Sequence, residues 1–162
     1  MQNGAASVAD VKMNLIAISG GDIVKGRHSN DAVFAQLDAR DAIIFGSPTD
    51  MGGPAAPFKA SADATGVKWH AGARRERLAA GFTASSGPSG DKSSTLHYFL
   101  TLAMQLGMSW IGLPELPMND QGSNPLSRGS GVMAQARPEA PDVAPDAPDK
   151  LTGERPGARG AG

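Results

Sequence analysis

Hydrophobic and polar residues change along the chain in blocks that predict strands and helices in alternation. Short apolar runs are typical of buried strands, whereas apolar residues spaced three or four positions apart indicate helices. The predicted strands cover residues 11–18, 42–45, 78–83 and 108–113. The predicted helices cover residues 31–37, 55–65 and 93–106. This order predicts an α/β fold in which helices cover a parallel sheet.

The ends of these helices carry recognisable signals. Gly66 and Gly107 stand where a glycine is expected just after a helix ends. Polar side chains that can accept the first free helical N–H groups stand at two helix starts: Asn30 or Asp31, and Ser93 or Ser94. The strongest helix prediction is therefore the capped segment at residues 93–106.

The composition changes after residue 113. From residue 137 onward, proline, alanine, glycine and charged residues dominate, and large apolar residues almost disappear. Such a segment buries too little surface to offset the entropy lost on ordering. We expect one domain at residues 1–136 and a disordered Pro/Ala/Gly-rich tail at residues 137–162.

Composition and charge narrow the classes of protein. The 162 residues fit one domain, and 40% hydrophobic residues suffice for a core. A net charge of −1 disfavours a nucleic-acid partner. No run is long enough to span a membrane and the first residues lack a secretory pattern, so we expect a cytoplasmic protein without a membrane partner. Without cysteine and without metal-ligand spacing among its three histidines, the sequence predicts no metal site.

Two loops that follow predicted strands are the candidate sites, because ligands bind at the carboxyl ends of strands in open α/β sheets. In the loop at residues 47–54, Gly52 and Gly53 allow close approach of a ligand to the backbone, although a plain turn explains the loop equally well. The loop at residues 84–92 offers serine hydroxyls beside a helix start, where N–H groups favour an anion. A solvated loop is the alternative there.

Trp69 is a third candidate, because it follows a predicted helix end in a polar stretch. It is either exposed and available to a ligand or partner, or packed in the core. No Ser/His/Asp pattern supports a catalytic triad.

Three segments together resemble a known family. They are PTDMGGPAAPFKASADATGVKW at residues 48–69, LAAGFTASSGPSGDKSSTL at residues 78–96 and LAMQLGMSWIGL at residues 102–113. They are similar to the flavodoxin-like NAD(P)H:quinone oxidoreductases and NADPH-dependent FMN reductases of the Trp-repressor-binding-protein type. The resemblance spans about residues 11–135.

The resemblance implies a flavodoxin-like, three-layer fold with a parallel sheet in the order 2-1-3-4-5. It also implies bound FMN, NAD(P)H as electron donor, a quinone or flavin as acceptor, and a homo-oligomer. The cofactor performs the hydride transfer, and the protein orients it. The tryptophan that matches Trp69 lines the active site, often across a subunit interface. The residues that the resemblance assigns to FMN are Pro48, Thr49, Asp50, Met51, Gly52, Ala84, Ser85, Ser86, Gly87, Pro88 and Ser89.

The chain also departs from the family pattern. The family's first strand and its phosphate-binding loop would precede residues 1–7, so we expect an incomplete flavodoxin-like domain that is truncated at its N-terminus. Position 50 is acidic where related loops carry arginine or a neutral residue. The alternative function is therefore a flavin-deficient, flavodoxin-like subunit or remnant that acts only by association.

Overall fold

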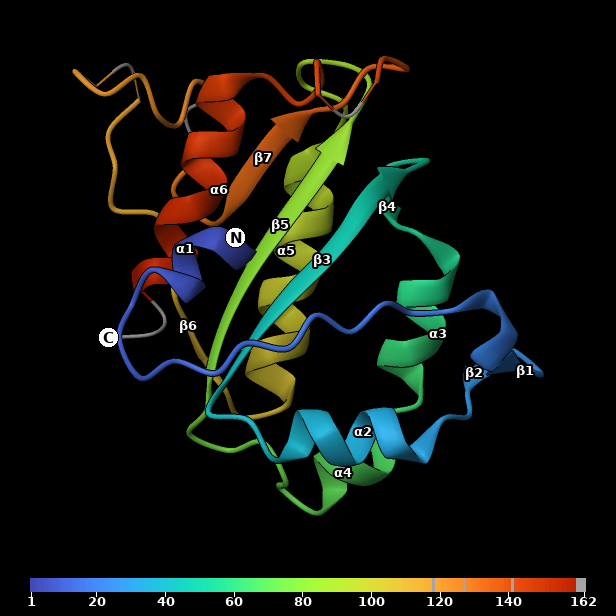
Figure 1. The fold of residues 1–162 in the computed structure, drawn as a ribbon. Helices are drawn as coiled ribbons and strands as arrows, with labels where there is room; N and C mark the ends of the chain where they lie inside the picture. The colour runs from blue at the N-terminus through green and yellow to red at the C-terminus, as the bar shows by residue number, and fades with distance from the viewer. Residues whose placement is uncertain (118, 127, 141, 160–162) are drawn as a thin grey trace.

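The computed structural model describes residues 1–117, 119–126, 128–140 and 142–159. A five-stranded sheet runs through the middle of the molecule, with helices on both of its faces (Figure 1). The strand order is β4-β3-β5-β6, and β7 also pairs with β5. The strands are β3 (Ala42–Asp50), β4 (Gly53–Pro54), β5 (Leu78–Ser85), β6 (Ser109–Trp110) and β7 (Val132–Gln135).

The long strands β3 and β5 form the centre of the sheet. They run parallel, in a register that extends from Ala42↔Leu78 to Pro48↔Ala84. Strands β6 and β7 are also parallel to β5 and follow one another along its other edge. The predicted α/β class with a parallel sheet is therefore confirmed, and β4 is a short antiparallel addition at the end of β3.

Helices connect these strands. They are α1 (Gln2–Ala6), α2 (Asp31–Asp38), α3 (Ala56–Asp63), α4 (Gly66–His70), α5 (Lys92–Gln105) and α6 (Ala147–Arg159). A short 3-10 turn, Gly20–Asp22, and the small hairpin of β1 (Ile23–Val24) and β2 (Arg27–His28) precede α2. Among the residues that the structure describes, no helix has the length and apolar character needed to cross a membrane.

One face of the β3–β5 pair is packed against helices, and we call it the covered face. Ile43 and Phe45 on β3 and Ala79 on β5 belong to the core on this side. Phe99 of α5 lies against Phe45 and Phe58, with ring centroids 6.0 and 4.6 Å away. The helical spacing predicted for α5 is therefore correct, because its apolar stripe supplies the centre of the core.

The alternate residues of the same strands form the opposite face, which we call the open face. Its residues are Ile44, Leu78, Ala80 and Phe82. A cavity of about 700 Å³ lies against this face and is bordered by α1, the end of α2 and residues 10–16. Phe82 is 38% exposed there, whereas Phe99 on the covered side is fully buried.

The segment at residues 11–18 is not a strand, and that prediction is wrong. Its apolar pattern suits a strand, but a strand also needs a neighbour to share backbone hydrogen bonds. The cavity separates the segment from β3, and no backbone hydrogen bond of residues 11–18 is found in the described part of the chain.

Three helix ends also differ from the predictions. The helix expected at residues 55–65 breaks after Asp63, and Gly66 begins α4 instead of closing α3. Asp91, in a left-handed conformation, precedes α5 in place of a serine cap. Asn30 caps α2 as expected, because its side chain accepts a hydrogen bond from the Val33 N–H at 3.4 Å.

The segment at residues 137–162 contains a helix where the sequence predicts disorder. Residue 141 and residues 160–162 lie outside the described residues. In α6, Asp149 and Thr152 are buried, and Thr152 Oγ1 accepts a hydrogen bond from the Asn124 N–H at 2.6 Å. The prediction counted apolar residues within the segment, whereas this helix is held through polar groups that bond to distant parts of the chain.

Candidate functional site

The first candidate loop is a tight hairpin. The sequence predicts that the strand before this loop stops at Gly46. In the structure, β3 continues to Asp50 and turns back into β4. The two turn residues, Met51 and Gly52, have φ angles of 48° and 79°. Positive φ at both central positions is typical of a two-residue hairpin turn, which explains the glycine. The turn leaves Met51 fully exposed at its tip.

A serine connects the start of this hairpin to the next helix. The Ser47 hydroxyl accepts a hydrogen bond from the Ala55 N–H at 2.9 Å and donates one to the Pro48 carbonyl at 2.9 Å. These two bonds fix the backbone on both sides of the hairpin, immediately before α3 begins.

Three threonine hydroxyls join the two candidate loops beneath their surface. Thr49 Oγ1 lies 2.8 Å from Thr83 Oγ1 on β5 and 2.8 Å from Thr95 Oγ1 on α5. Thr83 and Thr95 are almost completely buried. The cluster therefore holds the end of β3, the end of β5 and the first turn of α5 in one rigid arrangement.

Lys92 organises the second candidate loop. Its ammonium group donates hydrogen bonds to Ser85 Oγ at 2.9 Å, to the Gly87 carbonyl at 2.7 Å and to the Pro88 carbonyl at 3.0 Å. An ammonium has three donors, so this lysine is fully used by the loop. Lys92 is 0% exposed, which makes it a structural anchor of the loop.

Strand β7 supports the same loop from its other side. The Ala136 N–H donates to the Ser85 carbonyl at 3.0 Å, and Gln135 Nε2 donates to the Ser86 carbonyl at 2.9 Å. The loop is thereby fixed both by the helix that follows it and by a strand about fifty residues further along the chain.

A buried carboxyl group lies behind this support. Asp149 Oδ2 accepts a hydrogen bond from the Gln135 N–H at 2.7 Å. Burial raises the pKa of Asp149 and outweighs the hydrogen bond from Gln135 and the charge of Lys92, which lower it. Burial also lowers the pKa of Lys92, while the charge of Asp149 opposes that shift. The two groups therefore partly stabilise each other's charged forms behind the loop.

The structure brings most of the predicted site residues together. Residues 48–52 and 84–89 lie at the same carboxyl end of neighbouring parallel strands, where Pro48 pairs with Ala84. Trp69 does not lie with them. It belongs to α4, at the opposite end of β3 from β4, and is 57% exposed (Figure 1).

The sequence contained a signal for Lys92 that the predictions did not use. Positions 92, 96, 99 and 103 share one face of α5, and that face is buried. A lysine in phase with an apolar stripe must find oxygen partners inside the protein, and the preceding serine- and glycine-rich loop supplies them. Gln135 and Asp149 carried no such local signal, because their contacts are long-range.

Two hollows in the described part of the chain lie away from these loops. The larger one, of about 700 Å³, is at the open face, and a second of about 110 Å³ lies between α2 and β3. Neither hollow is lined by residues 47–54 of the hairpin or by residues 84–92 of the second loop. At the carboxyl end of β3 and β5, the two loops offer backbone groups and hydroxyls to a ligand.

Comparisons with known proteins agree with this architecture. A family model described as NADPH-dependent FMN reductase matches residues 10–122. The crystal structure of a flavodoxin, WrbA-like protein from Agrobacterium tumefaciens superposes with a TM-score of 0.67 at 34% identity, covering 86% of this chain and 75% of that one.

Curated proteins show the same likeness. Flavodoxin FldP of Pseudomonas aeruginosa is 36% identical over 115 residues, which cover 68% of this chain and 62% of that protein. An NAD(P)H dehydrogenase (quinone) of Geobacter sulfurreducens is 37% identical over 87 residues, covering 54% of this chain and 43% of that enzyme. The chain spans about half the length of the curated relatives that it matches.

Proposed function

The chain belongs to the NADPH-dependent FMN reductase family, and from this membership we propose that it forms the flavin-ring side of an FMN-dependent NAD(P)H oxidoreductase that reduces quinones or similar acceptors. One observation carries the proposal. The hairpin after β3 and the loop after β5 lie side by side, held by the Thr49–Thr83–Thr95 cluster and by Lys92. Preorganised backbone at this end of a parallel sheet is a typical place for a flat cofactor.

The residues present suit the ring of FMN better than its phosphate. The exposed turn at Met51 and Gly52 and the serines of the second loop offer apolar surface, backbone groups and hydroxyls to a ring and its edge. The ammonium of Lys92, which a phosphate would attract, is already bonded to three loop oxygens. When bound, FMN would supply the hydride chemistry, while these residues would orient its ring.

The eleven residues that the resemblance assigns to FMN belong to this proposal. Pro48, Thr49, Asp50, Met51 and Gly52 would contact the ring from the hairpin. The second loop would contribute its six residues from the other side: Ala84, Ser85, Ser86, Gly87, Pro88 and Ser89. The Thr49 hydroxyl is committed to the threonine cluster, so we assign the contact at Thr49 to its backbone.

Trp69 enters the proposal only through a second copy of the chain. It is exposed, and it lies at the opposite end of the sheet from the two loops. A homo-oligomer in which α4 of one protomer faces the loops of its partner would place the indole beside the flavin. A cytoplasmic location is also part of the proposal, supported by a sequence without cysteine.

Flavin titration of the chain tests the proposal. The expected result is quenching of FMN fluorescence, flavin bands that stay with the protein on gel filtration, and NADPH oxidation when a benzoquinone is added. Gly52→Pro is the matched variant, because proline cannot adopt the positive φ of the hairpin turn and should weaken binding. Riboflavin should bind about as well as FMN, since the ring contacts carry the interaction.

The second candidate is a flavin-deficient subunit that acts by association. The full use of Lys92 favours this candidate, because its ammonium keeps no donor for a phosphate. It predicts that neither FMN nor riboflavin is retained and that no NADPH is oxidised, at any quinone concentration. That result would overturn the reductase proposal.

A further inference from the structure

A buried positive charge lies directly beneath the second loop. The three hydrogen-bond acceptors of Lys92 are neutral oxygens of Ser85, Gly87 and Pro88. The Ser85 hydroxyl gives its own hydrogen to the Gly87 carbonyl at 3.0 Å, so it accepts from the lysine, and three accepted bonds require an ammonium. Because Lys92 is 0% exposed, water screens this charge poorly, and its field extends into whatever rests on the loop.

The loop backbone has the same polarity as the lysine. The Gly87 and Pro88 carbonyls direct their oxygens toward the ammonium. The N–H of a trans peptide unit points away from its C=O, so the N–H of Ser89 is directed away from Lys92. Helix α5 begins at Lys92, and the N-terminus of a helix is the positive end of its dipole. The outer surface of the loop is therefore electropositive.

One buried carboxylate opposes this field. Asp149 is 5% exposed, and its negative charge acts on Lys92. Asp50 on the hairpin and Asp91 at the start of α5 are exposed, so solvent and salt weaken their fields. The field behind the loop is therefore determined mainly by two buried groups of opposite charge, Lys92 and Asp149.

We propose that Lys92 sets the reduction potential of a flavin ring on the second loop by favouring the reduced ring, and that Asp149 opposes this effect. The inference rests on the proposed function, because it places FMN at residues 84–89. A ring that takes up two electrons and one proton gains one negative charge, whereas the oxidised ring is neutral. A buried cation behind the loop stabilises the reduced ring more than the oxidised one. Lys92 contacts no ligand and acts through its field.

A lysine with only a structural role would give a different result. Lys92 also orders the loop, so its replacement can weaken flavin binding in either case. Loss of order weakens the binding of the oxidised and reduced rings alike, whereas loss of charge changes the ratio of the two affinities. The midpoint potential of the bound flavin measures that ratio, because binding and reduction are thermodynamically linked.

A redox titration of FMN bound to the full chain tests the proposal. It is made at about pH 8, well above the ordinary pKa of an aspartate. Lys92→Gln keeps amide donors for the loop oxygens but removes the charge. Its relative affinity for the reduced ring should fall by at least about tenfold, which lowers the midpoint potential by ~30 mV. Lys92→Arg keeps the charge, and its midpoint should stay closer to that of the parent chain.

Asp149 provides a second variant with an effect of opposite sign. Asp149→Asn keeps an acceptor for the Gln135 N–H and removes the negative charge. Its midpoint potential should become more positive, and this direction decides the test if Lys92→Gln does not hold FMN. The Ala136 amide bonds to the Ser85 carbonyl, so its protection from hydrogen exchange checks that the loop is intact in each variant.

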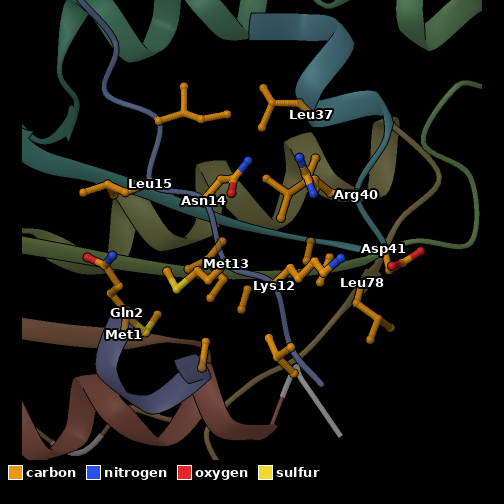
Figure 2. A pocket seen from close by; sticks show the side chains of 18 of the residues that line it. Met1, Gln2, Lys12, Met13, Asn14, Leu15, Leu37, Arg40, Asp41 and Leu78 are labelled. Atoms are coloured by element: carbon orange, nitrogen blue, oxygen red, sulfur yellow. The ribbon is translucent and has the colours of Figure 1, made fainter. Parts of the chain in front are cut away.

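Lys12 provides the matched control. Figure 2 shows it on the segment that crosses the open face, where it lines the large cavity away from residues 84–92. Lys12 is exposed, so solvent screens its charge. Lys12→Gln removes the same charge as Lys92→Gln and should leave the midpoint potential of FMN at the parent value.

Two results would overturn this inference while leaving the proposed function intact. One is an unchanged midpoint potential in both Lys92→Gln and Asp149→Asn. The other is a shift of the same sign in these two variants, which would indicate a loosened loop. In both cases FMN is still bound by the parent chain. If the parent chain retains no FMN, the proposed function fails and this inference fails with it.

Discussion

The covered and open faces of the β3–β5 pair are built from the same two strands yet differ in how tightly they are packed. On the covered face, Phe45, Phe58 and Phe99 form a ring cluster, and Phe99 is completely buried. On the open face, Phe82 is 38% exposed and borders a cavity of about 700 Å³. Alternation along a strand thus determines which residues share a face, whereas the burial of that face depends on which other segments cover it.

The largest expected difference between the faces comes from removing one ring on each side. Phe99→Ala should lower the free energy of unfolding by about 3–5 kcal/mol, because it leaves a cavity in a close-packed cluster. Phe82→Ala should lower it by under about 1 kcal/mol, since the Phe82 ring is partly in water already. Urea denaturation measures both, and equal losses would mean that the open face is packed in solution.

Two glycines give a matched test by adding a methyl group instead. A side chain at Gly81 would meet Trp110 at 2.8 Å and Phe99 at 2.9 Å, both packed rings, so Gly81→Ala should cost about 1–3 kcal/mol. A side chain at Gly46 would meet the far end of the Phe82 ring, which has room to move aside. Gly46→Ala should therefore cost less than about 1 kcal/mol in the same assay. The reverse order would contradict the assignment of the two faces.

The helix α6 can be tested through one hydroxyl. Thr152→Val keeps the shape of the side chain but removes the acceptor for the buried Asn124 N–H, which should cost about 1–2 kcal/mol. Lys150 lies on the exposed side of the same helix. Lys150→Ala should therefore change the unfolding free energy by less than about 0.5 kcal/mol. A disordered segment would show no effect for either variant in thermal or urea unfolding.

The smallest expected effect concerns pH. The pKa of Asp149 is raised in the folded chain, so its stabilising contribution is present below the unfolded pKa and is lost as pH rises through the folded value. Asp149→Asn retains an acceptor for Gln135 and cannot ionise. The variant should therefore gain stability relative to the parent chain as pH rises from about 4 toward 7. If the unfolding midpoints of the variant and the parent chain changed in parallel across this pH range, the raised pKa of Asp149 would be contradicted.

The sequence correctly predicted the elements that are determined by residues close together in the chain. The apolar stripe through Leu96 and Phe99 located α5, Asn30 located the start of α2, and the two loops were placed at the correct end of the sheet. The extent of β3 was missed because Pro48 and the residues around it read as a loop, whereas they form a hairpin that depends on the pairing of Thr49 with Pro54.

The remaining misses share a physical cause. Residues 11–18 carry a strand pattern, but a strand is completed only by a neighbour, and no local signal reports whether that neighbour exists. The helix α6 contains two prolines and two glycines, which disfavour a helix, and is held by Thr152 and Asp149 through partners more than ten residues away. Such long-range polar contacts cannot be inferred from composition.

The anchoring of the second loop by Lys92 has a thermodynamic consequence for any ligand. The loop is ordered when the chain folds, because three of its oxygens already bond to one buried ammonium. A ligand that meets a preordered loop does not have to pay its ordering entropy, so more of each contact appears as affinity. The same rigidity leaves the loop little freedom to close over a bulkier ligand. Selectivity at this end of the sheet therefore depends on how well a ligand already fits the shape of the ordered loop.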